Sequence, residues 1–243
     1  MTLLDAVLIV LLAGGASVVQ TLTGLGFSLM MVPPLILVVG VKDAVVVSNI
    51  LGTVVSAVLL TRTHRWVEWR TGGILLAASV VGMPAGLAVL VLANPDVLQV
   101  VIALAVMAFT VMLARGLRLH SAGLAGDAGA GIVSGILRMS TSMSGPPVAI
   151  YLQGKGLDSI AFRATLSAFF MASGVIGIGF FAAGGRINGE VLAEAAVAVP
   201  ALLAGFAAGQ ALYRRVDEAR FRRVVIVMLL VSSLMAMAAV AVH

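Results

Sequence analysis

Long apolar runs separated by short polar breaks constrain the fold of this sequence more than any other feature. Apolar residues make up 61% of the 243 residues and charged residues only 10%, which leaves too little polar surface to cover a water-soluble globule. A helix of about 20 apolar residues crosses a bilayer and pairs its own backbone groups there. The sequence therefore predicts an all-α polytopic membrane protein. Its clearest predicted spans are about 44–61, 72–92, 97–114, 164–183, 191–212 and 224–242.

The number and placement of the charged residues indicate which partners the protein binds. The formal charge is +5 at pH 7, but the basic residues fall between apolar runs and form no continuous basic face. We therefore expect membrane lipids as partners and no nucleic acid. The chain has no cysteine, which excludes disulfides, thiolate metal sites and cysteine nucleophiles. We expect no cofactor and a retained N-terminus, since no basic n-region or cleavage site is evident. A homodimer is compatible with the sequence.

Two further apolar stretches, 3–40 and 129–153, contain polar interruptions. We expect the first to be interrupted at Thr23-Gly24-Leu25-Gly26 and again at Pro33-Pro34, and the second between Met139 and Pro147. Glycine and proline disfavour a continuous helix at such positions. Both stretches are therefore predicted to be broken or re-entrant helices.

The two stretches belong to a duplication. The proline pair Pro33-Pro34 aligns with Pro146-Pro147, and Ser48 aligns with Thr165 once four residues are inserted in the second copy. Glycines at 82 and 86 likewise fall on glycines at 205 and 209. We predict one transmembrane domain over 1–243, with repeats at about 3–118 and 125–243. Each repeat is a broken segment followed by three helices, which gives about eight membrane segments.

The arginines between the spans bear on the orientation of the repeats. Three predicted loops are basic, whereas the loops near 94–96 and 184–186 are poor in cations. Cytoplasmic loops carry an excess of Lys and Arg, and all three basic loops share one side only if 129–153 adds an even number of crossings. This favours inverted repeats, and eight simple spans with parallel repeats are the alternative. The basic loops contain Arg62, Arg65 and Arg70; Arg115 and Arg118; and Arg214, Arg215, Arg220, Arg222 and Arg223.

The two interruptions supply the candidate substrate-binding residues. Broken helices of inverted-repeat transporters meet around a central site, where helix N-termini and free N–H groups favour an anion. The first set of candidates is Gly24, Gly26, Ser28, Arg138, Ser140, Thr141, Ser142, Ser144 and Gly145; the second is Gln20, Thr21, Thr23, Ser48, Asn49, Arg163 and Thr165.

Arg138 is the most informative of these candidates. A cation at the centre of a membrane helix costs about 2.5–3.5 kcal/mol, and no carboxylate lies near it in sequence, so an anionic substrate would supply the missing charge. The alternative is that Arg138 reaches a lipid headgroup. Other candidates have structural alternatives too: close helix packing for the small residues, an interhelical hydrogen bond for Asn49, and an interfacial anchor for Arg163.

These motifs resemble a known family. The glycine-rich break leading to Pro33-Pro34-Leu35, the later Ser48-Asn49, and their second copies in Ser144-Gly145-Pro146-Pro147 and Phe162-Arg163-Ala164-Thr165 are similar to the sulfite exporter TauE/SafE family. The resemblance covers nearly the whole chain. It implies a multi-pass transporter of the bacterial inner membrane that exports sulfite, an organosulfonate or another small anion.

Other functions remain open at this point. An intramembrane enzyme is disfavoured, because the three histidines lie in loops or at the terminus and form no catalytic or metal-binding group. We therefore predict no catalytic and no metal-binding residues. A non-transporting membrane scaffold, or a carrier of a small carboxylate, is compatible with the same sequence. The sequence specifies neither the anion nor the coupling ion.

Overall fold

The fold is a bundle of α-helices. The computed structural model describes residues 2–115 and 123–213, and within these ranges it contains nine α-helices, one short 3-10 helix and no strand. Six of the helices, α1, α3, α4, α5, α8 and α9, are long and apolar enough to cross a membrane. The elements are α1 (Leu3–Thr23), α2 (Phe27–Val39), α3 (Val41–Thr63), η1 (His64–Trp66), α4 (Trp69–Leu92), α5 (Pro95–Arg115), α6 (Gly123–Thr141), α7 (Gly145–Gly154), α8 (Ser159–Ala183) and α9 (Gly189–Tyr213).

Five of the six predicted spans are confirmed as helices, and the sixth, 224–242, lies outside the described residues. Each confirmed helix begins a few residues before the predicted apolar run, because a polar or charged residue lies in its first turn. In α8, for example, the Asp158 side chain accepts hydrogen bonds from the backbone N–H groups of Ile160 and Ala161. Such an N-cap stabilises the helix start although it does not raise hydropathy.

Both predicted interruptions are present as short breaks between helices. At the first, Gly24 and Gly26 have φ values of 80° and 103°, which glycine adopts without steric cost. At the second, Ser142 has φ of 61°, a conformation uncommon for a residue with a side chain. The chain therefore turns at residues 24–26 between α1 and α2, and at 142–144 between α6 and α7.

The prediction that Pro33-Pro34 interrupts the first stretch is wrong. Both prolines are buried inside the continuous helix α2, since neighbouring helices can compensate for lost backbone hydrogen bonds in a membrane bundle. Pro146 and Pro147 lie in the first turn of α7, where a missing N–H costs little. Glycine and serine, not proline, therefore make the turns.

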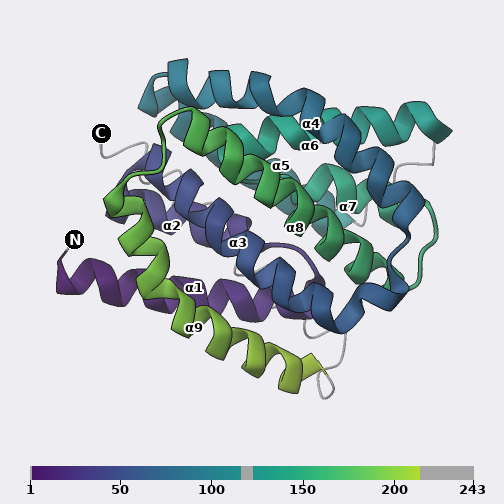
Figure 1. Cartoon of the computed structure of the whole chain (residues 1–243), viewed down its shortest axis with the longest axis horizontal. Helices are drawn as coiled ribbons and strands as arrows, with labels where there is room; N and C mark the ends of the chain where they lie inside the picture. The colour runs from purple at the N-terminus through teal and green to yellow at the C-terminus, as the bar shows by residue number, and fades with distance from the viewer. Residues whose placement is uncertain (1, 116–122, 214–243) are drawn as a thin grey trace.

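The two halves of the chain pack against each other in a reciprocal pattern (Figure 1). Helix α1 packs along α9, α4 packs along α6, and α3 packs along α8. A Cβ at Gly82 or Gly86 would overlap a backbone carbonyl of α6, and one at Gly205 would overlap a carbonyl of α1. The aligned glycines are thus packing faces, each against the first helix of the opposite half.

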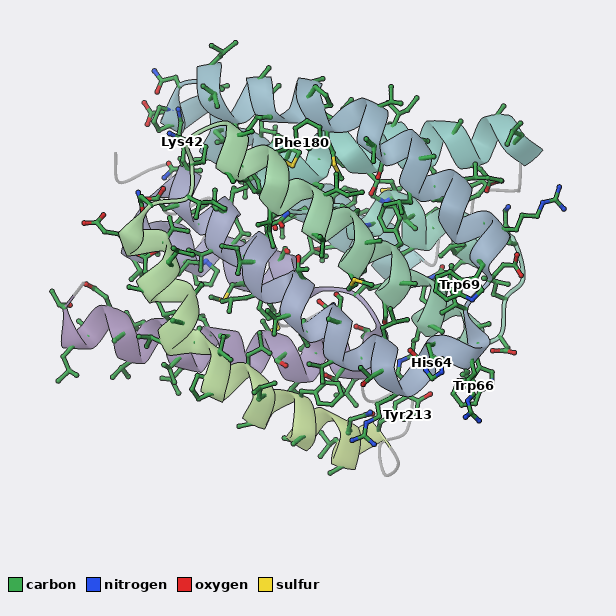
Figure 2. All side chains as sticks on the ribbon, viewed as in Figure 1. Lys42, His64, Trp66, Trp69, Phe180 and Tyr213 are labelled. Atoms are coloured by element: carbon green, nitrogen blue, oxygen red, sulfur yellow. The ribbon has the colours of Figure 1, made fainter. Side chains whose placement is uncertain are left out.

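The helix ends lie at two opposite sides of the bundle. Lys42, at the start of α3, and Phe180, near the end of α8, lie on one side, together with the N-terminus (Figure 2). His64 and Trp69 lie on the other side, as does Tyr213 at the end of α9. Helices α3 and α9 therefore run from the first side to the second, whereas α4 and α8 run back.

Candidate functional site

A small cavity lies where the two breaks approach each other. Its volume is about 30 Å³, enough for about two water molecules. The last turns of α1 and α6, the first turns of α2 and α7, and the middle of α3 and α8 all contribute to it. The lining residues are Gln20, Gly26, Phe27, Ser28, Leu29, Ser48, Asn49, Gly52, Ser56, Arg138, Ser142, Met143, Ser144, Gly145, Pro146 and Phe170.

Ser28 and Ser142 bring the two breaks into direct contact. Their hydroxyl oxygens lie 3.1 Å apart, and either can donate the hydrogen bond. Ser28 is the second residue of α2, and Ser142 is the residue with positive φ that ends α6. Segments more than a hundred residues apart in sequence therefore meet through one pair of hydroxyl groups.

Arg138 is buried beside this contact, with 4% of its surface exposed. Its Nη1 donates to Ser144 Oγ at 3.0 Å, and its Nη2 donates to the Phe170 carbonyl at 3.0 Å. Its Nε has no partner among the described residues. Over the same residues the only ion pair joins Lys155 to Asp127, so Arg138 has no carboxylate partner there. Within the described part of the chain, this guanidinium therefore has hydrogen bonds but no counter-charge.

Ser48 and Asn49 present unused polar atoms to the same cavity. Asn49 is 1% exposed, and neither its amide nitrogen nor its amide oxygen has a hydrogen-bond partner among the described residues. The Ser48 hydroxyl also lacks a partner in this part of the chain. Gln20 differs, because its Nε2 donates to Ser56 Oγ at 2.7 Å. Buried polar groups are normally paired, so the free atoms of Ser48 and Asn49 point to a ligand or water in the cavity.

Nine of the sixteen candidate residues line this cavity. Three come from the first half's helix ends, two from α3, and four from the second break and its flanks. They are Gln20, Gly26, Ser28, Ser48, Asn49, Arg138, Ser142, Ser144 and Gly145.

The other seven candidates lie elsewhere, and each has a local reason. Four hydroxyls bond to a carbonyl four residues earlier in their own helix, as polar side chains often do within helices. Thr165 instead accepts a hydrogen bond from the Glu68 backbone N–H at 3.0 Å, and Gly24 packs against Arg163, which contacts the end of α1. The four self-bonded residues are Thr21, Thr23, Ser140 and Thr141.

Several lining residues were missed from the sequence. Gly52 and Ser56 share a face of α3 with Asn49, three and seven residues along, and this helical spacing was a usable signal. The apolar members Phe27, Leu29, Met143, Pro146 and Phe170 gave no such signal. A further unpredicted feature lies outside the cavity: Asp127 is 4% exposed and pairs with Lys155 at 2.7 Å.

The cavity chemistry is that of an anion or polar-ligand site. One uncompensated cation and several hydroxyl and amide donors converge there, and no group of three or more His, Asp or Glu residues that could hold a metal occurs in the described part of the chain. An anion of four or more heavy atoms needs more room than about two water molecules. The cavity must therefore widen when such a ligand binds.

The six apolar helices, with a polar cavity between the two breaks, are those of a multi-pass membrane protein. Comparison with known proteins gives the family: residues 8–236 match the model of the sulfite exporter TauE/SafE family, and the chain belongs to that family. This confirms the resemblance seen in the sequence motifs, and the family is described as one of sulfite exporters. No curated protein and no solved structure matches the chain significantly.

Proposed function

We propose that this protein exports a small sulfur-containing anion, such as sulfite or an organosulfonate, and that the anion binds in the cavity between the two breaks. The observation that carries this proposal is the buried guanidinium of Arg138, which faces the cavity with no carboxylate partner among the described residues. An intramembrane cation is costly unless it has a function or a counter-charge. The anion supplies that charge.

The neighbouring side chains have distinct proposed roles. Asn49 and Ser48 donate to the oxygen atoms of the anion, because their polar atoms are buried and have no hydrogen-bond partner within residues 2–115 and 123–213. Ser28 and Ser142 separate when the cavity widens, and their hydroxyls then bond to the anion instead of to each other. Hydrogen bonds to a charged group contribute about 1.5–3 kcal/mol each, so a few such donors with Arg138 give a selective site.

The helix ends also favour an anion in this place. Helices α2 and α7 begin at the breaks, so the positive ends of their dipoles face the cavity. Helices α1 and α6 end there, so their negative ends also approach. An arginine lies at each of these negative ends, Arg163 beside the end of α1 and Arg138 in the last turn of α6. Their charges offset the repulsion that an anion would otherwise meet.

The transport mechanism we propose is alternating access between inverted repeats, in about eight membrane segments. In support, α3 and α8 run in opposite directions and so do α4 and α9 (Figure 2). Arg62, Arg65 and Arg70 lie on the side of His64, which the positive-inside rule assigns to the cytoplasm. The acid-bearing start of α9 then faces the outside of a bacterial inner membrane.

In this mechanism, two arrangements of the hairpins expose the cavity in turn to the two sides of the membrane. The hairpin α1–α2 and its partner α9 rock against the hairpin α6–α7 and its partner α4, with α3 and α8 between them. Export needs no proton in this scheme, because the membrane potential drives an anion outward with about 2.3 kcal/mol per charge per 100 mV.

Ligand-dependent stability and flux test the proposal. Purified protein is heated with sulfite, sulfoacetate, thiosulfate or acetate, and the same anions are offered to proteoliposomes under an imposed potential. We expect one sulfur anion to raise the melting temperature and to show saturable flux. Stabilisation and flux with acetate alone would identify a carboxylate carrier, and no response to any of the four would contradict the proposal in favour of a scaffold.

A further inference from the structure

Arg163 has a role that the cavity lining does not reveal. It lies on α8 and is 7% exposed, yet it does not line the cavity. We propose that Arg163 is a positioning residue, which holds the end of α1 and thereby fixes the geometry of the first break. In this role it acts through Gln20 and Ser28 and does not touch the anion. This role of Arg163 deepens the proposed function, and only its expected effect on transport rests on that function.

The contacts of Arg163 join three elements at one point. Its Nη2 donates a hydrogen bond to the Thr21 carbonyl, in the last turn of α1. Its guanidinium carbon lies 3.9 Å from the ring centroid of Tyr213, the last residue of α9. Helix ends leave carbonyls without intrahelical partners, and a cation at a helix C-terminus is stabilising. Arg163 therefore caps α1 from a neighbouring helix.

Gly24, a residue of the first break, also packs against Arg163. A Cβ at Gly24 would lie 2.9 Å from Cγ and 3.2 Å from Cα of Arg163, closer than side-chain atoms pack without displacement. The φ of 80° at Gly24 also favours glycine. The turn after α1 thus passes directly over the backbone and stem of Arg163, and the guanidinium extends along the helix end.

The residues held by this contact belong to the cavity. Gln20 precedes the capped Thr21 carbonyl by one residue, and the Gln20 carbonyl accepts the Gly24 N–H at 2.7 Å. Two residues further on, Gly26 has φ of 103° and leads into Ser28, which contacts Ser142. A shift of the α1 end would therefore move Gln20 and Ser28 together.

The two breaks are held by arginines that come from different parts of the chain. At the second break, Arg138 lies in α6 itself and donates to Ser144, across its own break. In the alignment of the repeats, Arg163 corresponds to Val46, a buried apolar residue of α3. The first break therefore depends on an arginine from the other half, whereas the second carries its own.

A cross-linking rate in the absence of any anion tests this role. The chain has no cysteine, so Ser28→Cys/Ser142→Cys reports the distance between the two breaks without interference. We expect Arg163→Gln to slow disulfide formation in this background by about two- to fivefold, the change expected when one capping contact is lost. Arg65→Gln is the matched control, since Arg65 is an exposed arginine near the same end of the bundle, and it should leave the rate unchanged.

Further variants keep the test decisive if Arg163→Gln folds poorly. Gly24→Ala retains the arginine but displaces it, and it should slow cross-linking as Arg163→Gln does. Arg163→Lys retains the charge and should restore part of the rate.

An unchanged rate in a monodisperse Arg163→Gln or Gly24→Ala protein would overturn the proposal. A variant that loses anion binding but cross-links normally would also overturn it, by making Arg163 a ligand. If the wild-type protein moves none of the anions and the Arg163 effect persists, the transport proposal fails and the positioning role remains.

Discussion

The hydroxyl groups of Ser28 and Ser142 are 3.1 Å apart, and this contact joins the break between α1 and α2 to the break between α6 and α7. Both residues line the cavity. In the mechanism we propose, the cavity widens to admit an anion, and this contact opens during each transport cycle. Because the two residues are so close, a cross-link between them can test this motion.

Oxidation of Ser28→Cys/Ser142→Cys should therefore stop transport. Cysteines at these positions lie within reach of the disulfide geometry, and the bond would hold the breaks together. We expect flux in proteoliposomes to fall to background after oxidation and to return after reduction. Each single cysteine variant should keep its flux under the same oxidant. Full flux through a quantitatively cross-linked protein would show that the breaks do not separate.

Replacing Asn49 should separate function from stability. Asn49→Leu removes a buried amide without partners among the described residues, so the free energy of unfolding should rise by about 1–3 kcal/mol. Anion affinity should fall about ten- to a hundredfold, the cost of about 1.5–3 kcal/mol for a lost bond to a charged ligand. Thermal denaturation and the KM of flux measure the two effects.

Gln20→Leu provides the comparison for that variant. It breaks the bond from Gln20 to Ser56, so its stability should fall by about 1 kcal/mol instead of rising. If Asn49→Leu also loses stability, then the Asn49 amide has a structural partner and its proposed role as a ligand is wrong.

Two glycines of α6 should respond in opposite ways to alanine. A Cβ at Gly135 would overlap the Ser79 carbonyl of α4, whereas a Cβ at Gly129 meets nothing within 4 Å. We expect Gly135→Ala to destabilise the protein by about 3 kcal/mol through overpacking, and Gly129→Ala to stabilise it by about 0.5–1 kcal/mol. Thermal denaturation in detergent measures both. Equal melting temperatures for the two variants would contradict the close packing of α4 on α6.

The ion pair between Asp127 and Lys155 should contribute to stability more than to binding. Asp127→Asn leaves the ammonium without its partner, and a broken buried pair costs about 3–5 kcal/mol. The Lys155 side chain is 20% exposed, so solvent screening should reduce this to about 1–2 kcal/mol. Asp127→Leu/Lys155→Met should recover most of the loss, as measured by thermal denaturation. A double variant as unstable as Asp127→Asn would show that the loss has another cause.

The sequence predicts the spans well because a segment that is apolar enough to enter a membrane also forms a helix there. It predicts the first break equally well, since Gly24 and Gly26 adopt positive φ values that favour glycine. It misleads at Pro33-Pro34, where neighbouring helices support a continuous α2. Whether a proline ends a membrane helix depends on tertiary contacts that hydropathy does not contain.

The site was predicted less completely than the fold. Polar residues near the breaks were identified, but periodicity alone does not say which hydroxyls bond to their own helix, as Thr21 and Thr141 do. Arg163 was expected to bind substrate, yet its contacts are with α1 and Tyr213. Asp127 was overlooked because its partner, Lys155, is distant in sequence. Such pairings arise from the packing of helices and require the structure.

The most direct test of the account is the flux of the transported sulfur anion through Arg138→Gln beside Arg65→Gln in proteoliposomes. Removing one partner of a buried charge pair costs at least about 2 kcal/mol, roughly a thirtyfold loss. We expect Arg138→Gln to insert normally and to lose at least about thirtyfold in kcat/KM, while the exposed-arginine control retains wild-type flux. Unchanged kinetics in a folded Arg138→Gln protein would contradict the central place given to this arginine.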